Sequence, residues 1–381
     1  MMERAAVILA GGRSERFQRR GESWVDKALT VVNGRTILEG IVVQLRDCVD
    51  EIAISVSREQ SRRTYLRALP ASIVDEIQIF VDEVPSGGPL AGIATSVKHL
   101  DAKQLLVLPC DTPFLNPAVV RTLFQRIRGN DAAIPIWPNG ALEPLMAVYK
   151  GSRVRSCCPM LSSAGRRRPD DLIRGSSRVR FVSIGRDLGV FDPEHRSFVN
   201  VNYRKDVNRS LRAPFPRGSL NKTFTASISL IRDRDLQAVS NAIQRVRRSQ
   251  DTWRGVVKPL MDYLQERKGF FWLALLAEET AKSVRVRRGS QRKDRKQLFE
   301  VAARACQSEA RLHLNNGLQS LSAHTLLDEA WCWGKAHDED RSKSALGAAA
   351  SIYARLGLDS KKSRTLATQR FKGTPRSASV G

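Results

Sequence analysis

The stretch that decides the fold lies at the start of the chain and reads Ala5-Ala6-Val7-Ile8-Leu9-Ala10-Gly11-Gly12-Arg13-Ser14-Glu15-Arg16-Phe17. Its apolar part predicts a buried β-strand, and the glycines that follow let the backbone approach a ligand closely. Arg16, and then Lys27, supply positive charge that persists at neutral pH. Together these features indicate a phosphate-binding turn. Two glycines taken alone are equally compatible with an ordinary tight turn between strand and helix.

Two better-known glycine loops are excluded by the spacing. A Walker A loop needs four residues between its glycines, followed by Gly-Lys-Ser/Thr, and a dinucleotide fingerprint needs Gly-x-Gly-x-x-Gly. Neither pattern occurs at the start of this chain. If the turn binds phosphate, it does so in another way.

The composition is that of a globular protein with two domains. The chain has 381 residues, 42% of them hydrophobic, and domains hold on the order of 150 residues. No apolar run reaches the roughly 18 residues of a membrane span, and the N-terminus lacks the pattern of a secretory signal. We therefore expect a cytoplasmic protein without a membrane segment. The six cysteines form no Cys-x-x-Cys pair, so they predict reduced, mostly buried thiols.

The charge is strongly positive and unevenly distributed. The formal net charge is +24, and residues 214–381 contain 31 Lys and Arg against 16 Asp and Glu. Such a field attracts phosphorylated substrates, RNA and acidic proteins alike. Because basic runs are more often solvated faces than dedicated sites, we expect no specific nucleic-acid binding.

The first half of the chain has the pattern of an α/β fold. Apolar runs predict strands at 6–9, 52–56, 77–81 and 104–108. Helix-like segments lie between them, as in residues 36–46, where apolar residues recur four positions apart. Alternating strands and helices predict a mostly parallel sheet covered on both faces, with ligands beyond the carboxyl ends of its strands.

The second half has a different pattern. Shorter strands are expected up to residue 206, including 145–149 and 179–182, and prolines and glycines then mark a linker. Beyond the linker, helical apolar spacing covers 233–248, 298–314, 325–337 and 345–356, with a basic connector over 284–296. We therefore expect an α/β domain (1–210), a linker (211–226), an all-α domain (227–368) and a disordered tail (369–381). The last helices resemble tetratricopeptide-type hairpins, and a plain helical bundle is the alternative.

Polar residues follow the expected strands where a ligand would bind. Asp111 follows the fourth strand between two prolines, where its carboxylate can bind a divalent cation that also contacts phosphates. The alternative is that Asp111 caps the helix that begins near residue 116. Asp82 precedes the glycine-rich loop 87–92, whose backbone can approach a base or ribose, and Gly92 is expected to open the next helix.

A further pair of polar residues lies near the end of the α/β region. Asn200 and Asn202 are separated by one residue on an extended segment, so their side chains point to the same side. Paired amide groups suit a polar heterocycle or a phosphate.

Taken in order, the motifs resemble the molybdenum cofactor guanylyltransferase family of nucleotidyltransferases. They are Leu-Ala-Gly-Gly-x-Ser-x-Arg-Phe, Asp-Lys-Ala-Leu, Gly-Pro-Leu-Ala-Gly, Pro-Cys-Asp-x-Pro-Phe and Asn-x-Asn, and they cover about residues 4–210. The resemblance implies a Rossmann-like fold and transfer of GMP from GTP to the phosphate of molybdopterin, with release of pyrophosphate and the help of Mg²⁺. By the same resemblance, the nucleotide would be bound by Leu9, Ala10, Gly11, Gly12, Arg16, Lys27, Ser57, Asp82, Gly88, Pro89 and Asp111.

The resemblance also assigns roles within this set. Arg16, Lys27 and Asp111 would be catalytic, and Asp111 would hold the metal. Asn200 and Asn202 would face the pterin of the acceptor. Catalysis would rest on alignment and charge neutralisation, because the attacking phosphate is already anionic and needs no general base.

The chain departs from the family pattern at three places. Nine residues, 17–25, separate Arg16 from Asp26, where the family usually has only a few. Ser57 stands where many members carry Asn, and Tyr203-Arg204 replaces the usual Thr-Pro after the second Asn. The glycine turn and the two asparagines therefore lie in altered surroundings.

Three functional alternatives stay open. The same fold can use CTP or another phosphorylated acceptor, such as a cobamide precursor or a sugar phosphate, although the Ala-Gly-Gly turn favours guanine over cytosine. The basic helical region is also compatible with a scaffold for RNA or an acidic partner. By the resemblance, that partner would be a molybdoenzyme or a cofactor-biosynthesis protein.

Overall fold

The computed structural model describes residues 2–12, 17–18, 24–84, 87–203, 206, 215–216, 218–248, 253–285 and 289–370. The chain divides into two compact units. The first, called here the sheet unit, comprises Met1–Pro138, Leu142–Ile173 and Arg178–Thr225. The second, the helical unit, comprises Asn139–Ala141, Arg174–Ser177 and Ala226–Gly381, so it includes two short segments from the first half of the sequence.

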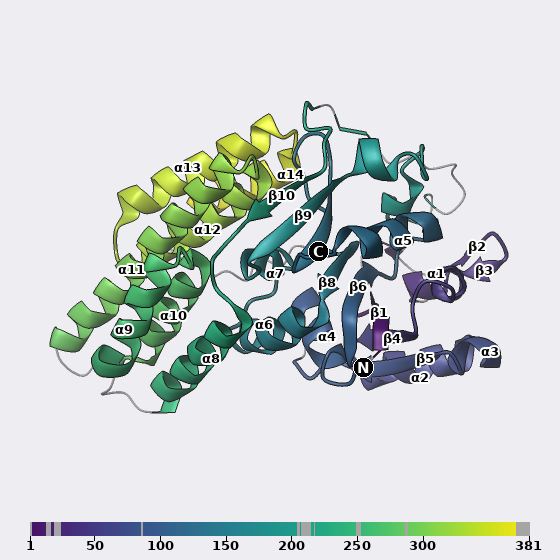
Figure 1. Cartoon of the computed structure of the whole chain (residues 1–381), viewed down its shortest axis with the longest axis horizontal. Coiled ribbons are helices and arrows are strands. Elements are labelled where there is room, and N and C mark those ends of the chain that lie inside the picture. Colours follow the sequence, from purple (N-terminus) through teal and green to yellow (C-terminus); the bar gives the residue numbers. More distant parts are fainter. Residues whose placement is uncertain are drawn as a thin grey trace. The chain divides into compact units, whose positions relative to one another are not determined.

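The sheet unit is built on a mostly parallel sheet (Figure 1). Among the described residues the strand order is β10-β9-β7-β8-β6-β1-β4-β5. β1 pairs in parallel with β4 and β6, β4 with β5, and β7 with β9, whereas β8 is antiparallel to β6 and β7. The bounds are β1 Met2–Leu9, β4 Glu51–Val56, β5 Ile77–Val81, β6 Ala102–Pro109, β7 Ala132–Ile136, β8 Ala147–Lys150, β9 Arg178–Ser183 and β10 Phe224–Ser227. The predicted α/β fold class is confirmed.

The central strand is apolar because both of its faces are covered. Ala5, Ala6, Val7 and Ile8 of β1 are fully buried, as expected for an inner strand of a parallel sheet. The helices α4 (Pro89–Ser96) and α6 (Gly151–Ser163) pack on each other, α4 also against β1, β4 and β5, and α6 against β6 and β8. The other helices of this region are α1 Ile37–Leu45, α2 Glu59–Ala68, α3 Ala71–Val74, α5 Pro117–Arg126 and α7 Asp170–Arg174.

The topology brings the polar loop residues to one edge of the sheet. β5, β4, β1 and β6 run in the same direction, and β7 runs with them because β8 is antiparallel to both β6 and β7. The residues just beyond their carboxyl ends therefore share one edge. In strand order they are Asp82, Ser57, Gly11, Asp111 and Trp137.

The structure corrects several details of the sequence-based expectations. α4 begins at Pro89, so Gly92 lies inside the helix rather than opening it. α11 (Gly289–Asn315) already covers part of the expected connector 284–296. The helices α9 (Trp253–Glu266) and α10 (Phe270–Ser283) were not expected, and β10 lies at the end of the segment expected as a linker. The expected tail residues 371–381 lie outside the described residues.

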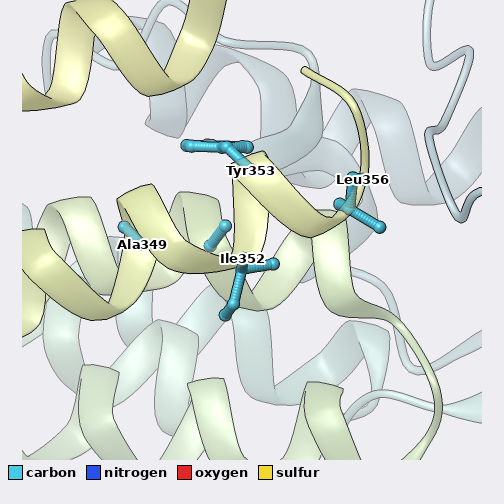
Figure 2. Close-up of a cluster of buried hydrophobic side chains, with 5 residues drawn as sticks. Ala349, Ile352, Tyr353 and Leu356 are labelled. Carbon is cyan, nitrogen blue, oxygen red and sulfur yellow. The ribbon is translucent and has the colours of Figure 1, made fainter. Parts of the chain in front are cut away.

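The helical unit is a succession of helices, each packed on the next. From α10 onward, α11, α12 (Gln319–Lys335), α13 (Glu339–Arg355) and α14 (Asp359–Arg370) follow one another, and α8 (Asp233–Arg248) and α9 pack on α10 and on each other. α13 shows why: Ala349, Ile352, Tyr353 and Leu356 recur at helical spacing and form a buried cluster with Ala323 of α12 (Figure 2).

The same turn separates these helices at a regular interval. Gly317, His337 and Gly357 all have a positive φ, and they stand twenty residues apart in the sequence. The residue after each donates its N–H to a carbonyl five residues back, Leu318 to His313, Asp338 to Trp333 and Leu358 to Tyr353. This is the Schellman helix ending. A two-helix unit therefore takes forty residues, whereas tetratricopeptide repeats take 34.

A buried ion cluster lies inside the helical unit. Arg174 donates from Nε and Nη2 to the two carboxylate oxygens of Glu309, both at 2.7 Å, and from Nη1 to Asp328 at 2.6 Å. His313 Nε2 lies 3.1 Å from Glu309, and the guanidinium covers the ring of Phe271. Buried charges are tolerated only when they are paired in this way.

The cysteines and the apolar segments were also the subject of sequence-based predictions. All six cysteines are free, and five of them are buried. Among the described residues, no helix is long and apolar enough to cross a bilayer.

Candidate active site

The glycine turn is held in place by its neighbouring strands. Ala10 donates its N–H to the carbonyl of Ser55 at 2.8 Å, and Cys110 donates its N–H to the carbonyl of Leu9 at 3.1 Å. The turn thus begins at fixed positions on β4 and β6. Gly12 is exposed, and a methyl group there would meet nothing within 4 Å, so its backbone is open to a ligand. Arg16 lies outside the described residues.

Lys27 and Asp111 form a direct ion pair at the centre of this edge. Lys27 Nζ lies 2.6 Å from Asp111 Oδ2, and both side chains are 15% exposed. The other carboxylate oxygen, Oδ1, is buried and accepts no hydrogen bond. The alternative for Asp111, a helix cap, is not observed, because the residue that caps α5 is Asn116, which accepts from the N–H of Ala118.

Asp26 positions the short helix that carries Lys27. Its Oδ1 accepts from the N–H of Ala28 at 3.0 Å, which caps the 3₁₀ turn Lys27–Leu29. Its Oδ2 accepts from the hydroxyl of the fully buried Tyr65 at 2.9 Å. Burial, with the nearby carboxylate, raises the pKa of Tyr65 far above its usual value, so its hydroxyl stays a donor.

Asp82 lies on the other side of the glycine turn. Its Oδ1 accepts from the hydroxyl of Ser55 at 2.5 Å. A methyl group on Gly11 would lie 3.4 Å from Asp82 Oδ2 and 3.5 Å from Ser57, so these three residues are neighbours. Burial raises the pKa of Asp82, and the Ser55 hydrogen bond opposes that rise. The half-buried carboxylate is an acceptor beside the turn, which suits a nucleoside.

Two glycines keep this part of the site compact. A methyl group on Gly92 would lie 2.2 Å from the hydroxyl of Ser55 and 3.0 Å from Leu9. Glycine therefore lets α4 approach β4, where Ser55 donates its hydrogen bond to Asp82. Gly88 caps α4 with a φ of +70°, and a methyl group there would lie 3.1 Å from the carbonyl of Arg167. Pro89 is the first residue of α4, where its missing N–H is not needed.

The two asparagines lie beside Asp111. Between them, the buried Val201 donates its N–H to the backbone carbonyl of Asp111 at 2.9 Å. Asn200 is exposed, and Asn202 is half-buried, with its N–H bonded to Asp206 at 3.1 Å. The structure therefore brings the backbone of the Asn200–Asn202 segment to the backbone of Asp111.

The N-terminal part of the chain matches known proteins. Residues 6–179 match the family model described as the MobA-like NTP transferase domain. A probable molybdenum cofactor guanylyltransferase from Methanosarcina mazei is 34% identical over 212 residues, which is 55% of this chain and 90% of that protein. The chain belongs to the molybdenum cofactor guanylyltransferase family.

A second relative agrees with this assignment. A molybdenum cofactor guanylyltransferase from Shewanella sp. MR-4 is 34% identical and covers 54% of this chain and 93% of that protein. The crystal structure of molybdopterin-guanine dinucleotide biosynthesis protein A from Archaeoglobus fulgidus is 24% identical, with a TM-score of 0.44, and covers 54% of this chain and 95% of that one. The family model ends at residue 179, so it does not include the helices of the helical unit.

The family assignment raises the question of a divalent metal, and the residues present fit one. Among the described residues there is no group of three His, Cys, Asp or Glu side chains that would hold a metal alone. Mg²⁺, however, is commonly bound by one or two carboxylates together with substrate phosphates and water. Asp111 offers one oxygen for this purpose, the buried Oδ1 that accepts no hydrogen bond.

Several supporting residues were missed by the sequence reasoning. Ser55 orients Asp82, Tyr65 orients Asp26, and Gln18 forms a reciprocal pair of hydrogen bonds with the backbone of Val25, at 2.8 and 3.0 Å. The last pair closes the base of the long loop that distinguishes this chain from its family. A serine within the apolar run 52–56 was the one visible signal among them.

Proposed function

We propose that this protein transfers GMP from GTP to the phosphate of molybdopterin and releases pyrophosphate. The observation that carries the proposal is the Lys27–Asp111 pair. The glycine turn and Asp82 follow strands on one side of β6, and the backbone between Asn200 and Asn202 is bonded to Asp111. A donor nucleotide and an acceptor that approach from the two sides would meet at this pair.

The proposed reaction is a displacement at the α-phosphorus of GTP. An oxygen of the acceptor phosphate forms a bond to that phosphorus, and the bond to the bridging oxygen between the α- and β-phosphates breaks. The electron pair leaves with pyrophosphate. The nucleophile is already an anion, so no side chain has to remove a proton, and alignment with charge neutralisation supplies the catalysis.

Each residue of the site has a defined task in this reaction. The exposed backbone at Gly12 faces the triphosphate, and the ammonium of Lys27 neutralises negative charge that gathers on the leaving group. Asp82 accepts hydrogen bonds from the guanosine. Asp111 would hold Mg²⁺ through Oδ1. When bound, the ion neutralises phosphate oxygens and makes the phosphorus more electrophilic.

The assay that tests the proposal measures pyrophosphate with each nucleotide in turn. The protein is incubated with Mg²⁺, molybdopterin and GTP, CTP, ATP or UTP. We expect release with GTP that depends on molybdopterin. Release with CTP instead, or with a cobamide precursor or sugar phosphate in place of molybdopterin, would assign the fold to another transfer. The absence of GTP-dependent release would overturn the proposal.

We also propose that the helical unit docks an acidic protein, such as a molybdoenzyme or a cofactor-biosynthesis protein. Four exposed cations, Arg292, Lys293, Arg295 and Lys296, stand within five positions at the start of α11. Reversal of Arg292 and Lys293 to glutamate should weaken binding to such a protein and reduce its salt dependence. Lys343→Glu on α13 is the matched control. Salt-dependent binding of RNA by the wild type, with no protein bound, would contradict this proposal.

A further inference from the structure

An aromatic cluster follows β7 on the same edge of the sheet. The indole of Trp137 lies 5.9 Å from the ring of His195, 5.6 Å from Phe198 and 6.0 Å from Phe215. His195 and Phe215 are also neighbours, at 4.7 Å. Trp137 is buried, but Phe215 is 50% exposed. Such an open set of rings is a surface on which a planar molecule can stack.

His195 is the unusual member of the cluster. It has a φ of +55°, a left-handed conformation that is uncommon outside glycine. Its Nε2 is buried and has no hydrogen-bond partner. Strained residues and unsatisfied buried polar atoms concentrate at functional sites. The imidazole therefore holds a hydrogen-bonding atom that no group of the described protein uses.

The turn that carries His195 is rigid. Asp192 accepts from the N–H of His195 through its backbone carbonyl, and from the N–H groups of Arg196 and Ser197 through its carboxylate, at 2.8 to 3.0 Å. Ser197 in turn accepts from the N–H of Asn116 at 3.0 Å. The strain at His195 is thus maintained by a hydrogen-bonded turn that is fixed to the loop after Asp111.

The cluster lies on the acceptor side of the phosphate site. In the sheet, β8 and then β7 lie on one side of β6. β1, which precedes Gly11, and β5, which precedes Asp82, lie on the other side. Trp137 follows β7 directly and so lies two strands along the sheet from β6. A molecule whose phosphate lies at Asp111 can therefore place a ring at the cluster.

We propose that His195, Trp137 and Phe215 form a subsite for the planar heterocycle of the acceptor, to which Nε2 of His195 is hydrogen-bonded. Phe215, which is 50% exposed, lies next to the imidazole at 4.7 Å, so the cluster is open to solvent on that side. The proposal rests on the function proposed above, because it assigns part of the acceptor to a place on the same sheet edge.

The decisive variant is His195→Phe, which keeps a ring in the cluster and removes the hydrogen bond. We expect the KM for molybdopterin to rise at least about tenfold, the value for one lost hydrogen bond, with the KM for GTP unchanged. A packing role alone predicts an unchanged KM for molybdopterin, since a phenyl ring needs no polar partner. The control is His99→Phe, because His99 also stacks on an aromatic ring, that of Phe80 at 4.5 Å, away from the cluster.

Binding without turnover separates this proposal from the function on which it rests. The Kd for free pterin (2-amino-4-oxopteridine) is measured by quenching of tryptophan fluorescence, and it should rise about tenfold in His195→Phe. His195→Asn should recover part of the lost affinity, because Asn tolerates positive φ and retains polar atoms. If wild type and His195→Phe bind pterin equally, or the wild type does not bind it, the subsite is wrong. Pterin binding that His195→Phe loses, in a protein without GTP-dependent turnover, would overturn the transfer reaction and leave the subsite in place.

Discussion

Lys27 Nζ and Asp111 Oδ2 lie 2.6 Å apart and join the loop after the glycine turn to the tip of β6. The two residues are separated by 84 positions in the sequence. The pair occupies Oδ2 of the carboxylate and leaves Oδ1 buried and without a hydrogen bond. A cation held there would stand within reach of phosphates on either side, so this one contact connects the two halves of the proposed reaction.

Asp111→Asn is the direct test of this arrangement. The amide keeps the shape of the side chain but removes the charge on which both Lys27 and a divalent cation depend. We expect kcat to fall by about 10² to 10³, the range for loss of one group that stabilises charge in a transition state. Pyrophosphate release is measured over a range of Mg²⁺ concentrations. The control is Asp101→Asn, the same change at a side chain of the sheet unit that is 64% exposed. Undiminished activity would remove Asp111 from the site.

Gly92→Ala should displace Ser55, which donates a hydrogen bond to Asp82, and so disturb the proposed nucleoside site. The added methyl group would lie 2.2 Å from the Ser55 hydroxyl that holds Asp82. We expect a loss of about 1 to 3 kcal/mol in the free energy of unfolding, as for an overpacked core, and a higher KM for GTP. Denaturant titration and initial rates measure the two effects. Gly40→Ala in α1, where a methyl group meets nothing within 4 Å, should be neutral or stabilising. Equal results for both variants would contradict the steric argument.

Asp82→Asn should separate stability from nucleotide binding. Burial raises the pKa of Asp82 in the folded protein above its ordinary value of 3.8. As the pH rises above 3.8, Asp82 loses its proton first in the unfolded chain and only later in the folded protein. The wild type therefore loses stability as the pH rises, whereas the asparagine variant does not. The variant should therefore gain stability relative to wild type between acidic and neutral pH, while its KM for GTP rises about tenfold. Urea titrations at pH 3.5 and 7 measure the first effect, and a pH-independent difference would be the contrary result.

Arg174→Met should destabilise the helical unit. It removes the guanidinium that pairs with the buried carboxylates of Glu309 and Asp328, a change that typically costs about 3 to 5 kcal/mol. The triple variant with Glu309→Met and Asp328→Leu should recover most of that loss, because apolar side chains can replace a buried ion cluster. Thermal unfolding of the full chain measures both. If the single and triple variants are equally unstable, the packing of Arg174 on Phe271 matters more than its charge.

The same cluster should give the helical unit an acid transition. Burial alone would raise the pKa of Glu309, but Arg174 and His313 hold it down to about 2. Because the folded pKa is below the ordinary value of 4.5, this stabilisation is complete above pH 4.5 and is lost as the pH falls towards 2. Urea titrations followed by circular dichroism should show Glu309→Gln less stable than wild type at pH 5, with a difference that narrows as the pH falls towards 2, because glutamine has no carboxylate to protonate. Identical acid profiles would show that Glu309 does not control the transition.

The sequence predicted those features that depend on local pattern. Apolar runs located β1, β4, β5 and β6, and the residues after them, Gly11, Asp82 and Asp111, meet at one edge because parallel strands place their carboxyl ends together. The sequence prediction omitted α9 and α10. It also assigned 284–296 to a connector because of its basic and glycine residues, whereas α11 begins at Gly289 and packs on α10 and α12 along its length.

Other features depended on contacts between residues far apart in the sequence. The bond between Lys27 and Asp111, the support of Asp82 by Ser55 and the bond between Val201 and Asp111 follow from strand order, which no local pattern specifies. The same holds for Arg174, whose guanidinium is paired 135 and 154 residues away in the sequence. The sequence by itself determined the sheet, its ligand edge and the chemical types that stand there. Only the tertiary structure decided which charges pair, which oxygen of Asp111 remains for a cation, and that Nε2 of His195 is buried without a hydrogen bond. These outcomes depend on distances that burial and packing impose.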